Sequence, residues 1–204
     1  MLQKCKSTFI QNIIPFALYL LFWLTISIAL LLYSKEYIHL KINNINSEIT
    51  DMFFKYFTHT GDGIFAALVI IAVLLKNKYQ GLFLAISAIL TGITVQLLKK
   101  IVFTDALRPI MHFEKLHLVE GVTMNKYHSF PSGHSAVAFV LFTGLLLLTR
   151  NKQWKIFFAL CAITAAISRV YLSQHFITDI FAGSLIGFVF SVIAYCFFLK
   201  RKYI

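Results

Sequence analysis

The sequence predicts an all-α fold, a polytopic membrane protein built as a six-transmembrane-helix bundle. Hydrophobic residues make up 59% of the 204 residues, charged residues only 13%, and the mean hydropathy is +0.78. A soluble domain of this size has about a quarter of its residues charged. Six apolar runs recur along the chain, and those of about 20 residues are long enough to cross a hydrocarbon core about 30 Å thick. These runs are 13–33, 58–75, 81–98, 134–149, 154–170 and 180–199.

The chain is expected to begin with a membrane span, followed by an interfacial segment. The first run is longer than a signal-peptide core and no small-residue cleavage site follows it, so it is expected to be a retained span. Residues 34–57 end in aromatic side chains typical of an interfacial helix or aromatic belt. The shorter runs need flanking residues or a packed neighbour to cross the membrane. No separate soluble domain is expected, and residues 1–204 are predicted to form one domain.

The cysteines indicate packing, and the length of the third connection is the other feature of note. The chain has three cysteines, Cys5, Cys161 and Cys196. An odd number gives no disulfide framework, and their spacing is not that of a zinc site, so they are expected to be packing residues. Residues 99–131 form the longest connection, and loops well beyond a dozen residues are usually functional or disordered.

Charge distribution predicts the orientation of the bundle. Ten of the 19 basic residues, and none of the acids, fall at the two termini and in the second and fourth connections. The positive-inside bias then places both termini in the cytoplasm and the histidine-bearing connections outside, in the periplasm if this is a bacterial inner-membrane protein. Because the basic residues flank spans and form no single stripe, a nucleic-acid partner is excluded. The ten basic residues are Lys4, Lys6, Lys76, Lys78, Arg150, Lys152, Lys155, Lys200, Arg201 and Lys202.

The string Pro131-Ser132-Gly133-His134 opens the fourth apolar run. Proline and glycine favour a tight turn, and Ser132 is suited to cap the helix that follows. Backbone N–H groups at a helix N-terminus bind anions, and Gly133 lets an oxyanion approach the backbone closely. His134 then lies beside the anion and can donate a proton to a leaving group. The string therefore predicts a phosphate-handling turn, with an ordinary helix cap as the alternative.

A second string joins the fifth and sixth runs. His175 and Asp179 are four residues apart and so share one face of a helix or helical turn. The aspartate can accept a hydrogen bond from one imidazole nitrogen and leave the other nucleophilic. Arg169 offers a planar fork for bidentate phosphate binding. The alternatives are a structural ion pair at a helix end and a zinc site, which is weak without a metal-ligand motif.

A third polar string, Thr60-Gly61-Asp62-Gly63, lies at the outer end of the second run with His59 beside it. Helix capping by Thr60 or Asp62 is the preferred interpretation, and assistance to the phosphate site is the other.

These motifs together resemble the type 2 phosphatidic-acid phosphatase superfamily, integral-membrane lipid phosphatases related to vanadium haloperoxidases, over about residues 58–199. The family pattern has a lysine before Arg-Pro, then Pro-Ser-Gly-His, then Ser-Arg followed by His and Asp. Here the second part is complete, and the third matches in spacing from Ser168 to Asp179. Arg108 and Pro109 end the first part. The family usually leaves six residues after its lysine, whereas Lys100 leaves seven and Lys99 eight; the neighbourhood of Lys100 matches better.

The resemblance implies a role for each matched residue. His175 attacks phosphorus to give a phosphohistidine, and Asp179 orients it. His134 acts as general acid toward the leaving group and then activates water. The phosphate oxygens are held by Lys100, Arg108, Ser132, Gly133 and Arg169. No metal and no other cofactor is implied, since cations and a helix N-terminus supply the electrostatic stabilisation.

The resemblance therefore implies a metal-independent membrane phosphatase that removes the terminal phosphate of a lipid phosphate or diphosphate at the outer leaflet. Candidate substrates are polyprenyl diphosphate, phosphatidylglycerol phosphate, phosphatidic acid and a lipid A phosphate. One alternative is a lipid phosphotransferase that uses the same site. Another is a transporter that catalyses no reaction. The sequence argues against a transporter, because the polar residues gather at one membrane edge, whereas a transport pathway needs them at mid-membrane.

Overall fold

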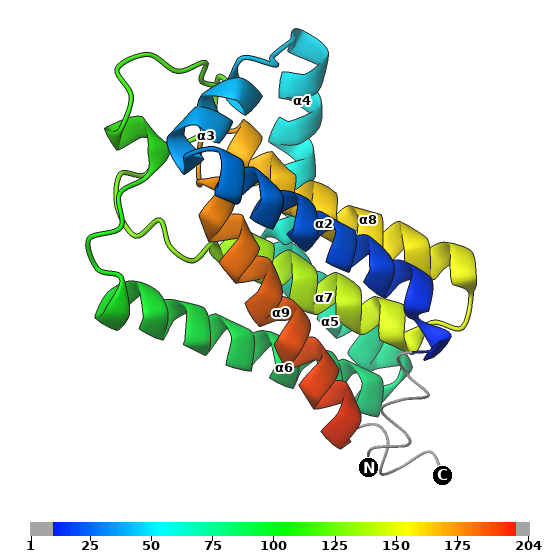
Figure 1. Ribbon diagram of the computed structural model, residues 1–204. Coiled ribbons are helices and arrows are strands. Elements are labelled where there is room, and N and C mark those ends of the chain that lie inside the picture. The colour runs from blue at the N-terminus through cyan, green and yellow to red at the C-terminus, as the bar shows by residue number, and fades with distance from the viewer. Residues whose placement is uncertain (1–9, 199–204) are drawn as a thin grey trace.

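The computed structural model describes residues 10–198 and is all-α, with no strand among those residues (Figure 1). Each of the six apolar runs coincides largely with one helix, and these six helices have 14 to 22 residues, which confirms the predicted fold class. Two short helices, α3 and α4, follow the first long one. The α-helices are α2 (Ile13–Leu32), α3 (Lys35–Asn43), α4 (Glu48–Phe57), α5 (Gly63–Lys76), α6 (Lys78–Leu97), α7 (Gly133–Leu148), α8 (Lys152–Tyr171) and α9 (Ile177–Phe198). Shorter turns are η1 (Thr58–Gly61), η2 (Leu98–Val102) and η3 (Pro109–Met111).

Four of the described helices are by themselves long and apolar enough to cross a membrane: α2, α6 with its extension to Val102, α8 and α9. Helix α4 with η1 forms a bent pair with α5, at an angle of 54°, that also qualifies when taken together. The chain is thus a multi-pass membrane protein. Helix α7 has only 16 residues.

The short helix α7 is surrounded mostly by protein. It packs against α6, α8 and α9, and most of its side chains are buried. A Cβ atom on Gly183 of α9 would lie 2.3 Å from the carbonyl oxygen of Ser132, and one on Gly187 would lie 2.2 Å from that of Ala136. Small residues four apart let two helix backbones touch, as they do in many membrane bundles.

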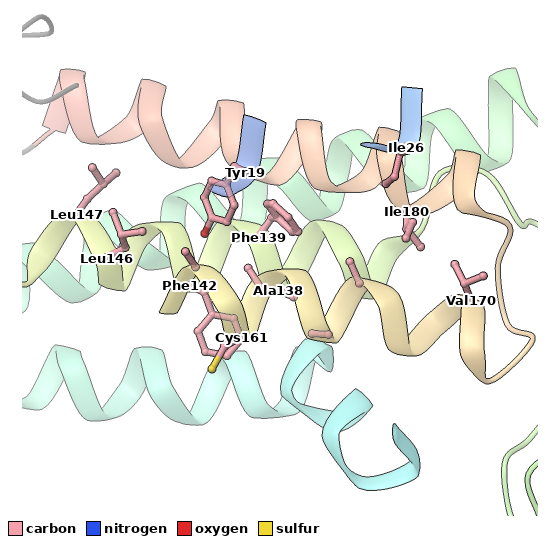
Figure 2. Packing of buried hydrophobic residues seen from close by; sticks show 14 residues of the cluster. Tyr19, Ile26, Ala138, Phe139, Phe142, Leu146, Leu147, Cys161, Val170 and Ile180 are labelled. Atoms are coloured by element: carbon pink, nitrogen blue, oxygen red, sulfur yellow. The ribbon is translucent and has the colours of Figure 1, made fainter. Parts of the chain in front are cut away.

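Aromatic packing ties α2 to this central helix. Figure 2 shows Tyr19 beside Phe139, with ring centroids 4.9 Å apart. The hydroxyl of Thr143 donates a hydrogen bond to that of Tyr19 at 3.2 Å, and the indole N–H of Trp23 donates to Ser184 of α9 at 2.9 Å. Such interhelical hydrogen bonds add specificity where every neighbour is apolar.

The two ends of the bundle differ in character. The first turn of α2 and the last turns of α9 lie at one end, whereas α3, α4 and the connection 103–132 gather at the other (Figure 1). The basic residues expected at the termini, and Cys5, lie outside the described residues. The end that carries α3, α4 and the long connection holds the polar strings.

Candidate active site

The two motif strings meet where α7 and α9 begin. The hydroxyl oxygen of Ser132 accepts a hydrogen bond from the backbone N–H of Ser135 at 3.3 Å, so Ser132 caps α7 as predicted. The backbone N–H of Ser132 donates to the carbonyl of Asp179 at 3.0 Å. A Cβ atom on Gly133 would touch only Val95, at 3.8 Å, so the backbone there stays open to approach. The start of α7 can therefore present N–H groups to an anion beside the second string.

His175 and Asp179 form a buried pair. Nδ1 of His175 lies 3.2 Å from Oδ2 of Asp179, and His175 is only 1% exposed. The same carboxylate oxygen accepts from the Ser129 hydroxyl at 2.5 Å and from the backbone N–H of Phe176 at 3.0 Å. Because Asp179 accepts the Nδ1 proton, Nε2 of His175 keeps its lone pair. The predicted pairing holds, although His175 precedes α9 instead of lying on it.

The surroundings keep His175 neutral. Burial lowers its pKa to about 3; the hydrogen bond and charge of Asp179 act in the opposite direction, and the positive charges of Arg108 and Arg169 act with burial. At neutral pH the imidazole is therefore unprotonated and available as a nucleophile.

Two buried guanidinium groups are joined through Gln174. Arg108 donates from Nη1 to the backbone oxygen and to Oε1 of Gln174 at 3.1 and 3.2 Å. Arg169 donates from Nη2 to the same Oε1 at 3.3 Å and from Nη1 to the hydroxyl of Thr58 at 2.8 Å. Nε of Arg169 is buried without a hydrogen-bond partner within residues 10–198. Burial lowers the pKa of Arg108, and the charge of Asp179 opposes that effect.

Of the two motif lysines, Lys99 is the one that interacts with these groups. Its side chain is buried and interacts electrostatically with Arg108, Arg169 and Asp179, whereas Lys100 is exposed. Motif spacing favours Lys100, but residues Leu98–Val102 form a π-helical turn, closed by a hydrogen bond from the N–H of Phe103 to the carbonyl of Leu98 at 2.8 Å. A π turn contains more residues than an α turn and changes which residue faces a given side.

His134 has a carboxylate partner of its own. Nε2 of His134 contacts Oδ1 of Asp62, and Oδ2 of Asp62 accepts from Nδ1 of His59 at 2.7 Å. The preferred capping role of Asp62 is not seen, since its side chain makes no cap hydrogen bond to α5. Burial raises the pKa of Asp62, but the hydrogen bond from His59 and the charges of both histidines outweigh it and lower that pKa.

Helix α3 supports the turn that carries His175. Ser173 has φ of 54°, a left-handed conformation that is uncommon outside glycine. Its hydroxyl is hydrogen-bonded to Nε2 of His39 at 3.2 Å and accepts from the side-chain amide of Asn43 at 3.1 Å. Burial lowers the pKa of His39 to about 4, so this support is uncharged at neutral pH.

Two backbone hydrogen bonds close the base of the long connection. The N–H of Arg108 donates to the carbonyl of Lys126 at 3.0 Å, and the N–H of Ser129 donates to that of Ala106 at 2.9 Å. A polar cavity of about 340 Å³ lies beside Asp179. Its lining includes Lys35, Asp105, His112 and Thr178.

The structure therefore groups most of the predicted residues. Ser132, Gly133, Arg108, Arg169, His134, His175 and Asp179 lie around one end of α7 and α9. Sequence reasoning missed Gln174, Ser129 and Thr58. Gln174 directly precedes His175 and Ser129 lies two residues before Pro131, which is the one signal that pointed to them, whereas nothing in the sequence marks Thr58. Among residues 10–198, no cluster of three or more His, Cys, Asp or Glu side chains has an arrangement that could hold a metal ion.

Two solved structures are similar to this chain over most of its length. Among solved structures, LpxE from Aquifex aeolicus aligns over 78% of this chain and 93% of its own, with a TM-score of 0.71 and 28% identity. The transmembrane PAP2 type phosphatidylglycerolphosphate phosphatase from Bacillus subtilis aligns over 93% of this chain and 98% of its own, with a TM-score of 0.65 and 25% identity.

A sequence relative is also found. The chain is 28% identical to the lipid A 1-phosphatase of Rhizobium johnstonii over 126 residues, which is 60% of this chain and 50% of that protein. The match thus spans half the length of this relative. The model of the PAP2 superfamily matches residues 80–203, more than half of the chain and including both motif strings. The resemblance seen in the motifs is confirmed, and the chain belongs to the PAP2 superfamily.

Proposed function

We propose that this protein is a membrane phosphatase that hydrolyses the terminal phosphate of a lipid phosphate or diphosphate through a phosphohistidine on His175. The observation that carries the proposal is the buried, neutral His175, held by Asp179 at 3.2 Å and set beside two buried arginines. A neutral imidazole with a fixed tautomer is a nucleophile, and the surrounding cations match the charge of a phosphate.

The reaction proceeds in two displacements at phosphorus. In the first, the lone pair on Nε2 of His175 forms a bond to phosphorus as the bond to the leaving oxygen breaks. A proton passes from His134 to that oxygen. In the second, water attacks phosphorus and gives a proton to His134, and the nitrogen–phosphorus bond breaks with its electron pair returning to His175. Asp179 stabilises the charge that develops on His175.

The phosphate oxygens are bound by Arg108, Arg169, Lys99 and the turn at Ser132 and Gly133. Nε of Arg169 is a buried donor without a partner in the described residues, and an oxyanion satisfies such a group. We propose Lys99 in place of Lys100, because Lys99 is buried next to both arginines. These cations and the start of α7 supply the electrostatic stabilisation, so no metal is required.

A lipid substrate is supported by the setting of the site. The relatives named above include a lipid A 1-phosphatase and a phosphatidylglycerolphosphate phosphatase. An apolar cavity of about 380 Å³, lined by α2, α8 and α9 residues such as Ile26, Ile167 and Ile180, is of a size and character that suit lipid tails. We propose that the whole chain forms one catalytic domain in the inner membrane. Its termini lie in the cytoplasm and its site faces the periplasm.

The test measures phosphate release by the detergent-purified protein from phosphatidic acid, phosphatidylglycerol phosphate, a polyprenyl diphosphate and a lipid A phosphate. We expect release from at least one lipid, unaffected by a chelator, and a fall of about 10³-fold or more in His175→Ala. His117→Ala, at a half-buried histidine whose Nε2 lies 2.8 Å from Oδ2 of Asp51, is the matched control and is expected to keep wild-type activity. Undiminished release by His175→Ala would remove the mechanism, and no release from any lipid would remove the function.

A further inference from the structure

The site contains a second histidine–carboxylate pair, His134 with Asp62, and the phosphatase proposal gives no role to its carboxylate. We propose that Asp62 is a positioning residue that holds His134 and opposes the loss of the proton that His134 donates as the general acid. This inference rests on the proposed function.

The geometry separates Asp62 from an ordinary helix cap. Its two carboxylate oxygens are both directed to histidines, Oδ1 to Nε2 of His134 and Oδ2 to Nδ1 of His59 at 2.7 Å. It precedes α5, but its side chain accepts no hydrogen bond from the first turn of that helix. A Cβ atom on Gly61 would lie 2.9 Å from the carbonyl oxygen of His134, so the segment that carries Asp62 is packed directly against the start of α7.

The charges around His134 explain why a carboxylate is needed. The pKa of His134 is lowered to about 4, first by burial and then by two cations, Arg169 of α8 and Lys99 of η2. From the junction of η1 and α5 the imidazole faces Asp62, the anion whose charge opposes theirs. A general acid must carry its proton when the substrate binds. Asp62 and the negative charge of a bound phosphate both favour the imidazolium. Without Asp62, burial and the cations leave His134 less able to hold the proton that the leaving oxygen needs.

The contact also fixes which nitrogen acts. Asp62 accepts the proton on Nε2, so the proton that is transferred is the one on Nδ1. As the bond between phosphorus and the leaving oxygen breaks, that proton moves to the oxygen and His134 becomes neutral. In the second step the attacking water returns a proton to Nδ1. His59, with a side chain 66% exposed, holds the other oxygen of Asp62 from the solvent side.

Leaving groups that differ in basicity test the role. A departing alkoxide needs protonation, whereas 4-nitrophenolate departs without it. The experiment compares kcat/KM for phosphatidic acid and for 4-nitrophenyl phosphate, over a range of pH, in the full-length wild type, Asp62→Asn and Asp62→Glu. In Asp62→Asn we expect a loss of about 10²-fold on phosphatidic acid and less than about 5-fold on 4-nitrophenyl phosphate. The alkaline limb of its pH profile moves to lower pH, because the imidazolium has lost its counter-charge.

Two further variants make the result specific. Asp62→Glu keeps the charge and restores part of the activity on phosphatidic acid. Asp51→Asn removes the same charge from the other half-exposed pair, in which Asp51 lies 2.8 Å from His117, and leaves the ratio between the two substrates unchanged. Equal losses on both substrates in Asp62→Asn, with an unmoved alkaline limb, would overturn the inference. An inactive wild type would instead overturn the proposed function.

Discussion

At the scale of single residues, the site depends on which side chains are buried together. Lys99 and Lys100 are neighbours of the same type, yet Lys99 is buried among the site's charges and Lys100 is exposed. The π turn that contains both residues makes this difference, since it changes the face on which each one emerges. The chain thus offers a matched pair in which only position differs.

We expect Lys99→Gln to lower kcat/KM for phosphate release by about 10- to 100-fold, since it removes a cation that stabilises the phosphoryl group in the transition state. Lys100→Gln should stay within about 2-fold of wild type, because a single exposed charge contributes little. Steady-state kinetics on the preferred lipid measures both. A larger effect of Lys100→Gln than of Lys99→Gln would return the phosphate contact to Lys100.

At the scale of elements, the contact between α7 and α9 fixes the site. Gly183 and Gly187 bring the two backbones together, and the hydrogen bond from Ser132 to the carbonyl of Asp179 joins their first turns. The phosphate-binding turn and the carboxylate that orients His175 therefore belong to one packed unit. Neither glycine can gain a side chain without separating the helices, because the atoms it would meet are backbone atoms.

Gly187→Ala is expected to destabilise the protein by about 3 kcal/mol, the upper range for forcing a methyl group into a packed contact. Gly92→Ala is the matched control in another helix, since a Cβ atom there meets nothing within 4 Å. This control should be neutral or slightly stabilising, because alanine favours helix more than glycine does. Thermal unfolding in detergent measures both variants. An unchanged Tm for Gly187→Ala would show that the contact is not tight.

At the scale of the whole molecule, the site lies at one end of the bundle and the described ends of the chain lie at the other (Figure 1). The charge distribution in the sequence predicts that the site end faces the periplasm.

Cysteine labelling tests this orientation. In a background with Cys5, Cys161 and Cys196 replaced by serine, Lys115→Cys lies in the long connection and Lys152→Cys at the opposite end, both exposed. A membrane-impermeant maleimide applied to intact spheroplasts should label Lys115→Cys at once and Lys152→Cys only after the membrane is permeabilised. The reverse pattern would place the site in the cytoplasm.

The sequence predicts those parts of the site that local strings encode. The helices follow from apolar runs, and His175 with Asp179 follows from a spacing of four residues. The contact between Asp62 and His134 could not be predicted, because it joins segments far apart in the chain, and local propensity favours a cap at Asp62. The choice of Lys99 depends on a π turn that no residue pattern announces. Gln174 bridges two arginines only once the chain has folded, so its amide had no visible partner in the sequence.

The two backbone hydrogen bonds that close the base of the long connection have an evolutionary consequence. The backbone N–H groups of Arg108 and Ser129 donate hydrogen bonds to Lys126 and Ala106. The residues between Arg108 and Ser129 therefore form a loop that is closed at its base. Substitutions of the exposed side chains on that loop can accumulate without displacing the guanidinium or the serine that serves Asp179, because the loop holds the guanidinium through the backbone oxygen of Tyr127. Headgroup preference can therefore drift among descendants of such a protein while the reacting groups stay where they are.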